Sequence, residues 1–218
     1  MQITSWYTDN FEDRLKGRYI TIKHILPLLD SYRNIFNVSV AGFSEMGVEI
    51  PLLTLGEGAK KVLIWSQMHG NESTTTKALF DFFKYISVNK QQTALLLSQY
   101  SFYVLPILNP DGAALYTREN ANNIDLNRDA EDVSQSESRV LRSIFDSLQP
   151  HLCLNMHDQR SIFGIDGPKP ATLSFLAPSA DALKTITPAR EFAMELIVKM
   201  KNYIQVYHHD QIGRFDDT

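Results

Sequence analysis

The stretch Trp65–Glu72, with the sequence WSQMHGNE, follows an apolar run at 62–65 that has the length and residue types of a buried strand. Apolar residues at helical spacing come next, from Ala78 to Ile86, so we expect a strand to end and a helix to begin here. In open parallel sheets, ligands bind at the carboxyl ends of strands. His69 and Glu72 place an imidazole and a carboxylate at such a point, and Zn²⁺ accepts these two donors together. Alone, a His-x-x-Glu pair is a weak signal, because it occurs by chance in many chains.

The composition of the 218-residue chain is that of an ordinary globular protein. Hydrophobic residues make up 44% and charged residues 21%, and we expect one domain over residues 1–218 with a substantial core. The net charge of −4 and the lack of a basic run argue against nucleic acid as a partner. The single cysteine, Cys153, excludes an internal disulfide, and its apolar neighbours indicate a buried small hydrophobic residue.

Residues 1–20 are polar and charged and contain no apolar segment of the kind found in a signal peptide. No apolar run in the chain approaches the roughly 18 residues that a membrane helix requires. We therefore expect a cytoplasmic protein without a membrane partner, although a chain stripped of its leader would look the same. The sequence does not predict the oligomeric state.

Strand-like and helix-like segments alternate along most of the chain. The expected strands are 37–41, 49–55, 62–69, 102–108 and 152–156. The expected helices are 22–29, interrupted by Pro27, then 73–87, 140–148 and 188–204. Pro106 indicates an edge position or the end of its strand, and turn chemistry at 109–112 precedes long loops at 113–132 and 163–179. This order predicts an α/β fold whose sheet is at least partly parallel.

His157 follows the apolar segment 152–156, so it stands at the end of another predicted strand. With His69 and Glu72 it completes a candidate set of three ligands. A catalytic zinc takes three protein ligands and keeps one position open for water. The alternative is that His157 only caps its strand with a hydrogen bond.

The long loop carries two arginines and an amide, Arg118, Asn127 and Arg128. Such groups beside a metal suit an anionic substrate, because a guanidinium binds a carboxylate through two hydrogen bonds. An arginine near a carbonyl on zinc can also hold the charge that develops on the carbonyl oxygen. The alternative is that these arginines are solvated and form salt bridges with nearby acids, namely Glu119, Asp129 or Asp132.

Several short motifs are spaced along the middle of the chain. They are His69–Gly70–Asn71–Glu72, Asn109–Pro110–Asp111–Gly112, Thr117–Arg118, Asp125–Leu126–Asn127–Arg128–Asp129 and Met156–His157–Asp158. In this order they resemble the motifs of zinc carboxypeptidases of the M14 family. The resemblance covers roughly residues 60–160 convincingly and the flanks loosely. Each motif alone is weak, but the agreement of several is specific.

The resemblance implies one zinc ion, bound by His69, Glu72 and His157. Arg118 would polarise the scissile carbonyl and stabilise the tetrahedral intermediate. The zinc would act as a Lewis acid and lower the pKa of its water. The implied fold is a mixed, partly parallel α/β sheet sandwiched by helices.

The resemblance also implies that Asn127 and Arg128 grip the free carboxylate at the C-terminus of the substrate. Family members often carry a second arginine between the histidine and the glutamate of the first motif, where this chain has Asn71. We therefore expect weaker carboxylate binding, or a preferred substrate that differs from a simple peptide.

The family's general base is a glutamate on a late strand, and this chain departs from that pattern. After His157 its only glutamates are Glu191 and Glu195, which fall on the polar side of the last predicted helix and are expected to be solvated. We interpret His208 and His209 as surface residues. We favour a fragment of a longer protein, because a parallel sheet without a late strand has an exposed edge. The alternative is a natural short form that binds zinc and ligand without efficient turnover.

These observations favour a zinc metallopeptidase that removes C-terminal residues from peptides. The first alternative is a zinc deacylase of the aspartoacylase or succinylglutamate desuccinylase type, acting on small acyl amino acids with a free carboxylate. That type shares the His-x-x-Glu start and an Asp-Leu-Asn-Arg segment, whereas the segment 109–112 favours the peptidase. Two further alternatives are a non-catalytic module that binds zinc and ligand, and a structural α/β domain with coincidental motifs.

Overall fold

The computed structural model describes residues 3–158, 173–179, 181–205 and 212–214. Contacts within the chain divide it into two compact units, Met1–Asp158 and Gln159–Thr218. All residues that the sequence assigns to metal or substrate binding belong to the first unit. The expectation of a single domain over residues 1–218 stays a prediction.

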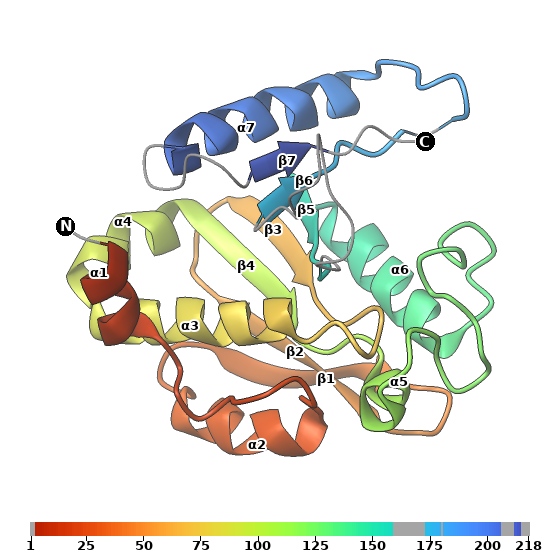
Figure 1. The fold of residues 1–218 in the computed structure, drawn as a ribbon, viewed down its shortest axis with the longest axis horizontal. Helices are drawn as coiled ribbons and strands as arrows, with labels where there is room; N and C mark the ends of the chain where they lie inside the picture. The colour runs from red at the N-terminus through yellow and green to blue at the C-terminus, as the bar shows by residue number, and fades with distance from the viewer. Residues whose placement is uncertain (1–2, 159–172, 180, 206–211, 215–218) are drawn as a thin grey trace. The chain divides into compact units, whose positions relative to one another are not determined.

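A mixed sheet forms the centre of the first unit (Figure 1). Its strands are β1 (Asn37–Phe43), β2 (Glu49–Leu55), β3 (Lys60–Trp65), β4 (Tyr100–Leu105) and β5 (Leu152–Asn155). They lie in the order β1-β2-β4-β3-β5. Strand β3 runs parallel to β4 and β5, whereas β2 is antiparallel to β1 and β4. The prediction of a mixed, partly parallel sheet is confirmed.

Helices cover both faces of this sheet, which confirms the sandwich arrangement (Figure 1). They are α1 (Ile3–Asn10), α2 (Ile22–Ser31), α3 (Thr74–Val88), α4 (Lys90–Gln99), α5 (Pro110–Leu115) and α6 (Ser136–Leu148). Side chains of β3 alternate between the two faces, as they do in any strand. Val62 and Ile64 pack in the core that α2 and α3 share, whereas Leu63 packs with Ile144 of α6. Packing on both sides therefore holds the carboxyl edge of β3 in place.

For Pro27 and Pro106, one predicted effect each is not observed. Pro27 lies inside α2, and the helix continues through it. A proline removes one backbone hydrogen bond from a helix, but Ile25, Leu28 and Leu29 anchor α2 in the core. Pro106 follows the end of β4, as one reading predicted, and the edge position is wrong because β4 lies between β2 and β3.

The turn expected at 109–112 is the start of a helix instead. Asn109 caps α5 by accepting a hydrogen bond from the Gly112 N–H (2.8 Å), and Pro110 occupies the first helical position, which needs no N–H. The expected loop is present from 116 to 132. Helices α1 and α4 were not predicted, and in α4 only Thr93 is buried, so no apolar periodicity marks it.

In the second unit, β6 (Leu173–Phe175) pairs in parallel with β7 (Ile212–Arg214), and α7 (Pro188–Gln205) lies between them in the chain. Helix α7 begins where predicted, with Thr187 Oγ1 accepting from the Arg190 N–H (3.2 Å). A loop was predicted over 163–179, and this is wrong at 173–175, which form strand β6. Residues 163–172, His208 and His209 lie outside the described residues. No helix among the described residues combines the length and apolar character needed to cross a membrane.

Candidate metal centre and active site

His69 lies in the loop that joins β3 to α3, although the strand was expected to reach it. Strand β3 ends at Trp65 because Gln67 adopts a φ of 45°, outside the extended region. The loop still runs beside the chain that follows β4: Ser66 N donates to Leu105 O and Asn109 N donates to Gln67 O, both at 3.0 Å. The backbone that carries the first metal-ligand candidate is therefore tied to the neighbouring strand.

The buried side chain of Gln67 holds this loop from several directions. Its Nε2 donates to Gly70 O (2.8 Å) and to Ile20 O (3.1 Å), and its Oε1 accepts from the Thr76 hydroxyl (2.7 Å). These bonds stabilise a backbone conformation that is uncommon for a residue with a side chain. No signal in the sequence pointed to Gln67, because its contacts come from three separate segments.

The segment 109–112 supports the same loop from the other side. Asn109 Nδ2 donates to Met68 O (3.2 Å). A Cβ atom added to Gly70 would lie 2.0 Å from the carbonyl carbon of Gly112, so the two backbones meet where only glycine fits. The motif 109–112 thus packs against the loop that carries the motif 69–72 and stabilises its conformation.

His69, Glu72 and His157 lie together, with their ligand atoms all within 4.8 Å of one another. His69 Nδ1 is 2.9 Å from Glu72 Oε1, and His157 Nδ1 is 2.8 Å from Glu72 Oε2. The two Nδ1 atoms are 3.1 Å apart. The residues meet because β5, which precedes His157, is the parallel neighbour of β3, so both strands deliver their carboxyl ends to one edge of the sheet.

The three side chains fit a zinc ion. Zinc bonds to nitrogen and oxygen are about 2.0–2.2 Å long, so tetrahedral ligand atoms are about 3.3–3.6 Å apart. The separations among His69 Nδ1, His157 Nδ1 and the two carboxylate oxygens of Glu72, 2.8 to 3.1 Å, are somewhat shorter. His69 is 2% exposed and His157 30%, so the cluster is closed on one side and open on the other. A catalytic zinc needs such an open position.

The carboxyl group of Glu72 is held in its ionised form. Burial opposes ionisation, but the hydrogen bonds with His157 and His69 outweigh it and lower the pKa of Glu72 to about 2. The Glu72 N–H also donates to His69 O (3.0 Å), so both residues share one turn of the loop. A metal ligand must be deprotonated, and Glu72 meets that condition at neutral pH.

Asp125 joins the metal-ligand candidates to Arg118, and no function was predicted for it. Its Oδ1 lies 3.1 Å from His69 Nε2, and its Oδ2 accepts from Arg118 Nε (3.0 Å). A carboxylate on the second ring nitrogen orients a metal-binding histidine. Burial opposes ionisation of Asp125, but the Asn127 N–H and the Arg118 guanidinium lower its pKa. The sequence did hold a signal that could have pointed to Asp125, because this residue begins the motif that contains Asn127.

Arg118 lies beside the cluster, as predicted for a residue that stabilises charge there. Its Nη1 is 3.2 Å from His69 Nδ1 and 3.4 Å from Glu72 Oε1, and its side chain is 34% exposed. It pairs with Glu72 and Asp125, whereas the alternative of a solvated arginine predicted pairs with Glu119, Asp129 or Asp132. The guanidinium is therefore held beside the His69 and Glu72 side chains of the cluster.

Asn127 and Arg128 follow on the same loop, and their side chains are less firmly held. The Asn127 N–H donates to Asp125 Oδ1 (2.9 Å), which ties its backbone to the cluster. Arg128 is exposed, and its Nη1 donates to Asn127 O (3.2 Å). Within the described residues, no ion pair involves Arg128. The structure thus places both residues next to Asp125, with the Arg128 guanidinium facing solvent.

Asp158 connects His157 to the helix that follows the first two ligand candidates. Its carboxylate accepts from the N–H groups of Thr74 (3.0 Å) and Thr75 (3.3 Å) at the start of α3, and its own N–H donates to Glu72 Oε2 (3.2 Å). A carboxylate at a helix N-terminus stabilises the unpaired N–H groups there. The last motif, Met156–His157–Asp158, is therefore anchored to the helix that follows the first motif.

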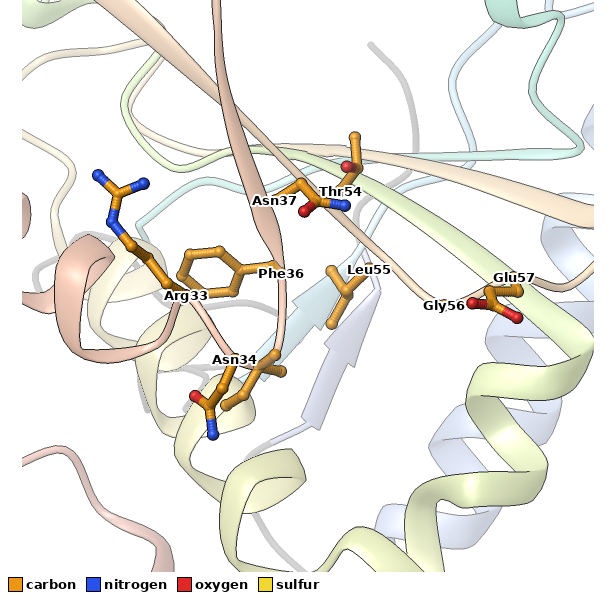
Figure 2. A pocket seen from close by; sticks show the side chains of 9 residues that line it. Arg33, Asn34, Phe36, Asn37, Thr54, Leu55, Gly56 and Glu57 are labelled. Atoms are coloured by element: carbon orange, nitrogen blue, oxygen red, sulfur yellow. The ribbon is translucent and has the colours of Figure 1, made fainter.

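Other expected features lie away from this cluster. Glu191 and Glu195 are exposed on α7, as predicted, and belong to the second unit. Cys153 is half-buried, and burial raises the pKa of its thiol. A surface cavity of about 290 Å³ is lined by residues 33–37 and 54–57 (Figure 2), and another of about 460 Å³ by residues of α3 and the segment 7–17. None of the candidate site residues lines either cavity.

The fold and the cluster define an α/β protein with a candidate His–Glu–His metal site at the carboxyl edge of its sheet. Residues 22–161 match the family model described as zinc carboxypeptidase. The chain therefore belongs to the zinc carboxypeptidase family, and the resemblance seen in its motifs is confirmed.

Individual relatives agree with this assignment. The chain is 30% identical to "Carboxypeptidase 2" of Trichophyton rubrum over 129 residues, 54% of this chain and 24% of that protein. A metallo-carboxypeptidase structure from Burkholderia cenocepacia matches with a TM-score of 0.71 and 18% identity, over 91% of this chain and 54% of that one. A metallo-carboxypeptidase from Pseudomonas aeruginosa, in complex with (2-guanidinoethylmercapto)succinic acid, matches with a TM-score of 0.65, 18% identity and coverage of 91% and 52%. The chain thus spans about a quarter to a half of the length of these relatives.

Proposed function

We propose that this protein is a zinc-dependent metallocarboxypeptidase that hydrolyses the C-terminal bond of a peptide with a free carboxylate. The observation that carries the proposal is the convergence of His69, Glu72 and His157, with Arg118 in contact with His69 and Glu72. Membership of the zinc carboxypeptidase family supports it. The alignment with "Carboxypeptidase 2" covers 24% of that protein. The activity is therefore proposed for the whole protein and not for the first unit alone.

His69, Glu72 and His157 would hold the zinc ion, and Asp125 would keep the His69 ring turned so that Nδ1 faces the ion. The bound ion would supply Lewis acidity and lower the pKa of water. Arg118 would donate hydrogen bonds to the substrate carbonyl oxygen as negative charge develops on it. Its pairing with Asp125 orients the guanidinium for this task before the substrate arrives.

Asn127 and Arg128 would bind the terminal carboxylate of the substrate. A carboxylate only accepts hydrogen bonds, and an amide NH₂ together with a guanidinium offers donors only. The relative from Pseudomonas aeruginosa was solved with a succinic acid derivative, a ligand that carries carboxyl groups, which supports an acidic ligand for this family. The exposed guanidinium of Arg128 is available for such a ligand.

The first experiment compares three substrate classes on the zinc-loaded protein. N-blocked dipeptides with a free C-terminal carboxylate are expected to be hydrolysed, and the same dipeptides with an amidated C-terminus are expected to react poorly. Turnover of N-acyl amino acids alone would replace the peptidase with the deacylase. Binding of the free-acid dipeptide without hydrolysis would favour the non-catalytic module, which is consistent with the exposure of Glu191 and Glu195 on α7.

A substitution tests the proposed clamp. Arg128→Ala is expected to raise KM for free-acid dipeptides with little change in kcat, because it removes binding energy that is the same in the ground state and the transition state. The matched control is Arg33→Ala, since Arg33 is also an exposed arginine but pairs with Asp30 and lines the cavity in Figure 2, away from the cluster. An equal effect of Arg128→Ala on free-acid and amidated substrates would contradict the clamp.

A further inference from the structure

Asn155 is a polar residue beside the proposed clamp to which neither the motifs nor the metal chemistry gives a function. It is the last residue of β5, and its side chain is exposed. Its Nδ2 lies 3.4 Å from Asn127 Oδ1 and 3.8 Å from Met68 Sδ. Asn155 is thus in contact with the side chain of one of the two residues proposed to bind the substrate carboxylate.

The neighbours of Asn155 determine which way its amide points. Which end of an amide is nitrogen is decided by its hydrogen bonds. The Met68 sulfur is an acceptor with no hydrogen to donate, so the nitrogen of Asn155 faces it, and the same NH₂ group then reaches the side-chain oxygen of Asn127. The Asn155 amide therefore presents a donor to Asn127.

This donor determines in turn the orientation of the Asn127 amide. The backbone of Asn127 is already fixed, because its N–H donates to Asp125 Oδ1 (2.9 Å) and its carbonyl accepts from Arg128 Nη1 (3.2 Å). Only the side-chain amide is left to turn. With Oδ1 engaged by Asn155, Nδ2 becomes the free end, and in the part of the chain that the structure describes no acceptor contacts it.

We propose that Asn155 is a positioning residue that holds the Asn127 amide with its NH₂ group toward the substrate, and so makes the site selective for a terminal carboxylate. The proposal rests on the proposed function of Asn127 and Arg128. A carboxylate accepts from NH₂ but is repelled by an amide oxygen. A turned Asn127 would offer its oxygen and would suit a substrate that ends in an amide. Asn155 therefore acts through Asn127 and does not itself touch the substrate.

The test is a double-mutant cycle with an equilibrium readout. The dissociation constants of a free-acid N-blocked dipeptide and its amidated form are measured by calorimetry on the zinc-free full chain, which is not expected to hydrolyse them. Asn155→Leu removes the donor without adding charge, and we expect the free acid to bind about 5-fold to 10-fold more weakly, the loss of one hydrogen bond that orients a charged contact. Binding of the amidated form is expected to change less than about 2-fold.

Asn155→Asp adds an acceptor, so Asn127 must turn its nitrogen toward residue 155. We expect free-acid binding to fall by more than about 10-fold and discrimination against the amide to disappear. In an Asn127→Ala background both Asn155 substitutions are measured again. There, Asn155→Leu is expected to have no effect, and the effect that Asn155→Asp retains measures the added charge alone.

The outcomes separate the inference from the proposed function. If wild type prefers the free acid and the Asn155 and Asn127 effects multiply independently, Asn155 is an ordinary strand-end residue and the inference is wrong, while the clamp stands. If wild type does not distinguish acid from amide, the clamp fails and the inference fails with it. Zinc content and melting temperature are measured for each variant, and Asn155→Ala, which also lacks a side-chain donor, replaces Asn155→Leu if the leucine variant does not fold.

Discussion

Glu72 and Glu12 are two ionised glutamates of the first unit that both lie largely out of contact with solvent but differ in their partners. The Glu12 side chain is 2% exposed and that of Glu72 16%. Burial opposes ionisation in both, and hydrogen bonds outweigh it in both, so that each pKa is lowered to about 2. Glu12 is bound by Arg14 through Nε and Nη2, both at 2.7 Å, and by the Tyr32 hydroxyl. Glu72 is bound by two imidazoles.

The difference lies in what those partners can do. A guanidinium and a buried hydroxyl give Glu12 only hydrogen-bond donors, so that cluster is complete as it stands. An imidazole nitrogen can release its proton and coordinate a metal ion. A low pKa therefore shows that a carboxylate is well paired, and only the chemistry of its partners separates a structural ion pair from a metal site. The predictions below test this contrast.

The largest expected effect comes from neutralising each glutamate in turn. Glu72→Gln is expected to weaken zinc binding by at least about 100-fold, more than the change of a residue that only supports a ligand, while the fold is retained. Glu12→Gln is expected to leave zinc binding unchanged and to lower the free energy of unfolding by about 1–3 kcal/mol, because a buried hydrogen-bond network loses its charged acceptor. Zinc titration and thermal melting of both variants give the two readouts.

The same pair of variants supplies its own control, since each is the reference for the other. Stoichiometric zinc in Glu72→Gln at micromolar concentration would reject Glu72 as a ligand. Loss of zinc in Glu12→Gln without loss of stability would show that the two clusters are coupled, which their separate partners do not predict.

The next effect concerns Asp125, which contacts His69 without being a ligand candidate. Asp125→Asn is expected to weaken zinc binding about 10-fold to 100-fold, because His69 loses the carboxylate that orients its ring. Asp30→Asn is the matched control: Asp30 is an aspartate paired with an arginine, but its pair is exposed. Isothermal titration with zinc measures both. Equal affinities for the two variants would show that Asp125 does not support the metal site.

Much of the fold follows from periodic apolar residues in the sequence. Segments with a clear period, such as α3, α6 and α7, were predicted close to their observed bounds. The ends of elements were less predictable, because they depend on contacts from elsewhere: β3 ends early since Gln67 bonds to Ile20 and Thr76. Helix α4 has almost no buried face, and so the sequence lacks the pattern that would reveal it.

The meeting of the ligand candidates could be predicted because parallel neighbouring strands present their carboxyl ends at one edge. His69 and His157 are brought together by the pairing of β3 with β5, and topology alone suffices for that. The contacts of Asp125 and Asn155 could not be predicted. Asp125 lies on a loop without periodicity, and the position of Asn155 beside Asn127 depends on how that loop folds back.

A smaller effect is expected in the pH dependence of stability. The pKa of Glu12 is about 2 in the folded protein and 4.5 in its ordinary range, so ionisation favours folding. This stabilisation is fully present above pH 4.5 and is lost as the pH falls toward 2. Melting temperatures of wild type and Glu12→Gln should therefore differ most near neutral pH and converge near pH 2. A difference that stays constant over this range would contradict the low pKa.

The smallest expected effect separates a supporting carboxylate from the metal ligands that surround it. Asp158→Ala removes the side chain that caps α3. It is expected to lower the free energy of unfolding by about 1 kcal/mol and the melting temperature by about 2–4 °C. Zinc affinity should change less than about 3-fold, because the bond from the Asp158 N–H to Glu72 belongs to the backbone and survives the substitution. Asp158→Asn keeps one acceptor oxygen and should lie between alanine and wild type. If Asp158→Ala instead weakened zinc binding more than about tenfold at an unchanged melting temperature, Asp158 would support the metal cluster itself. It would then belong with Glu72 and Asp125 and not with the carboxylates that only stabilise the fold.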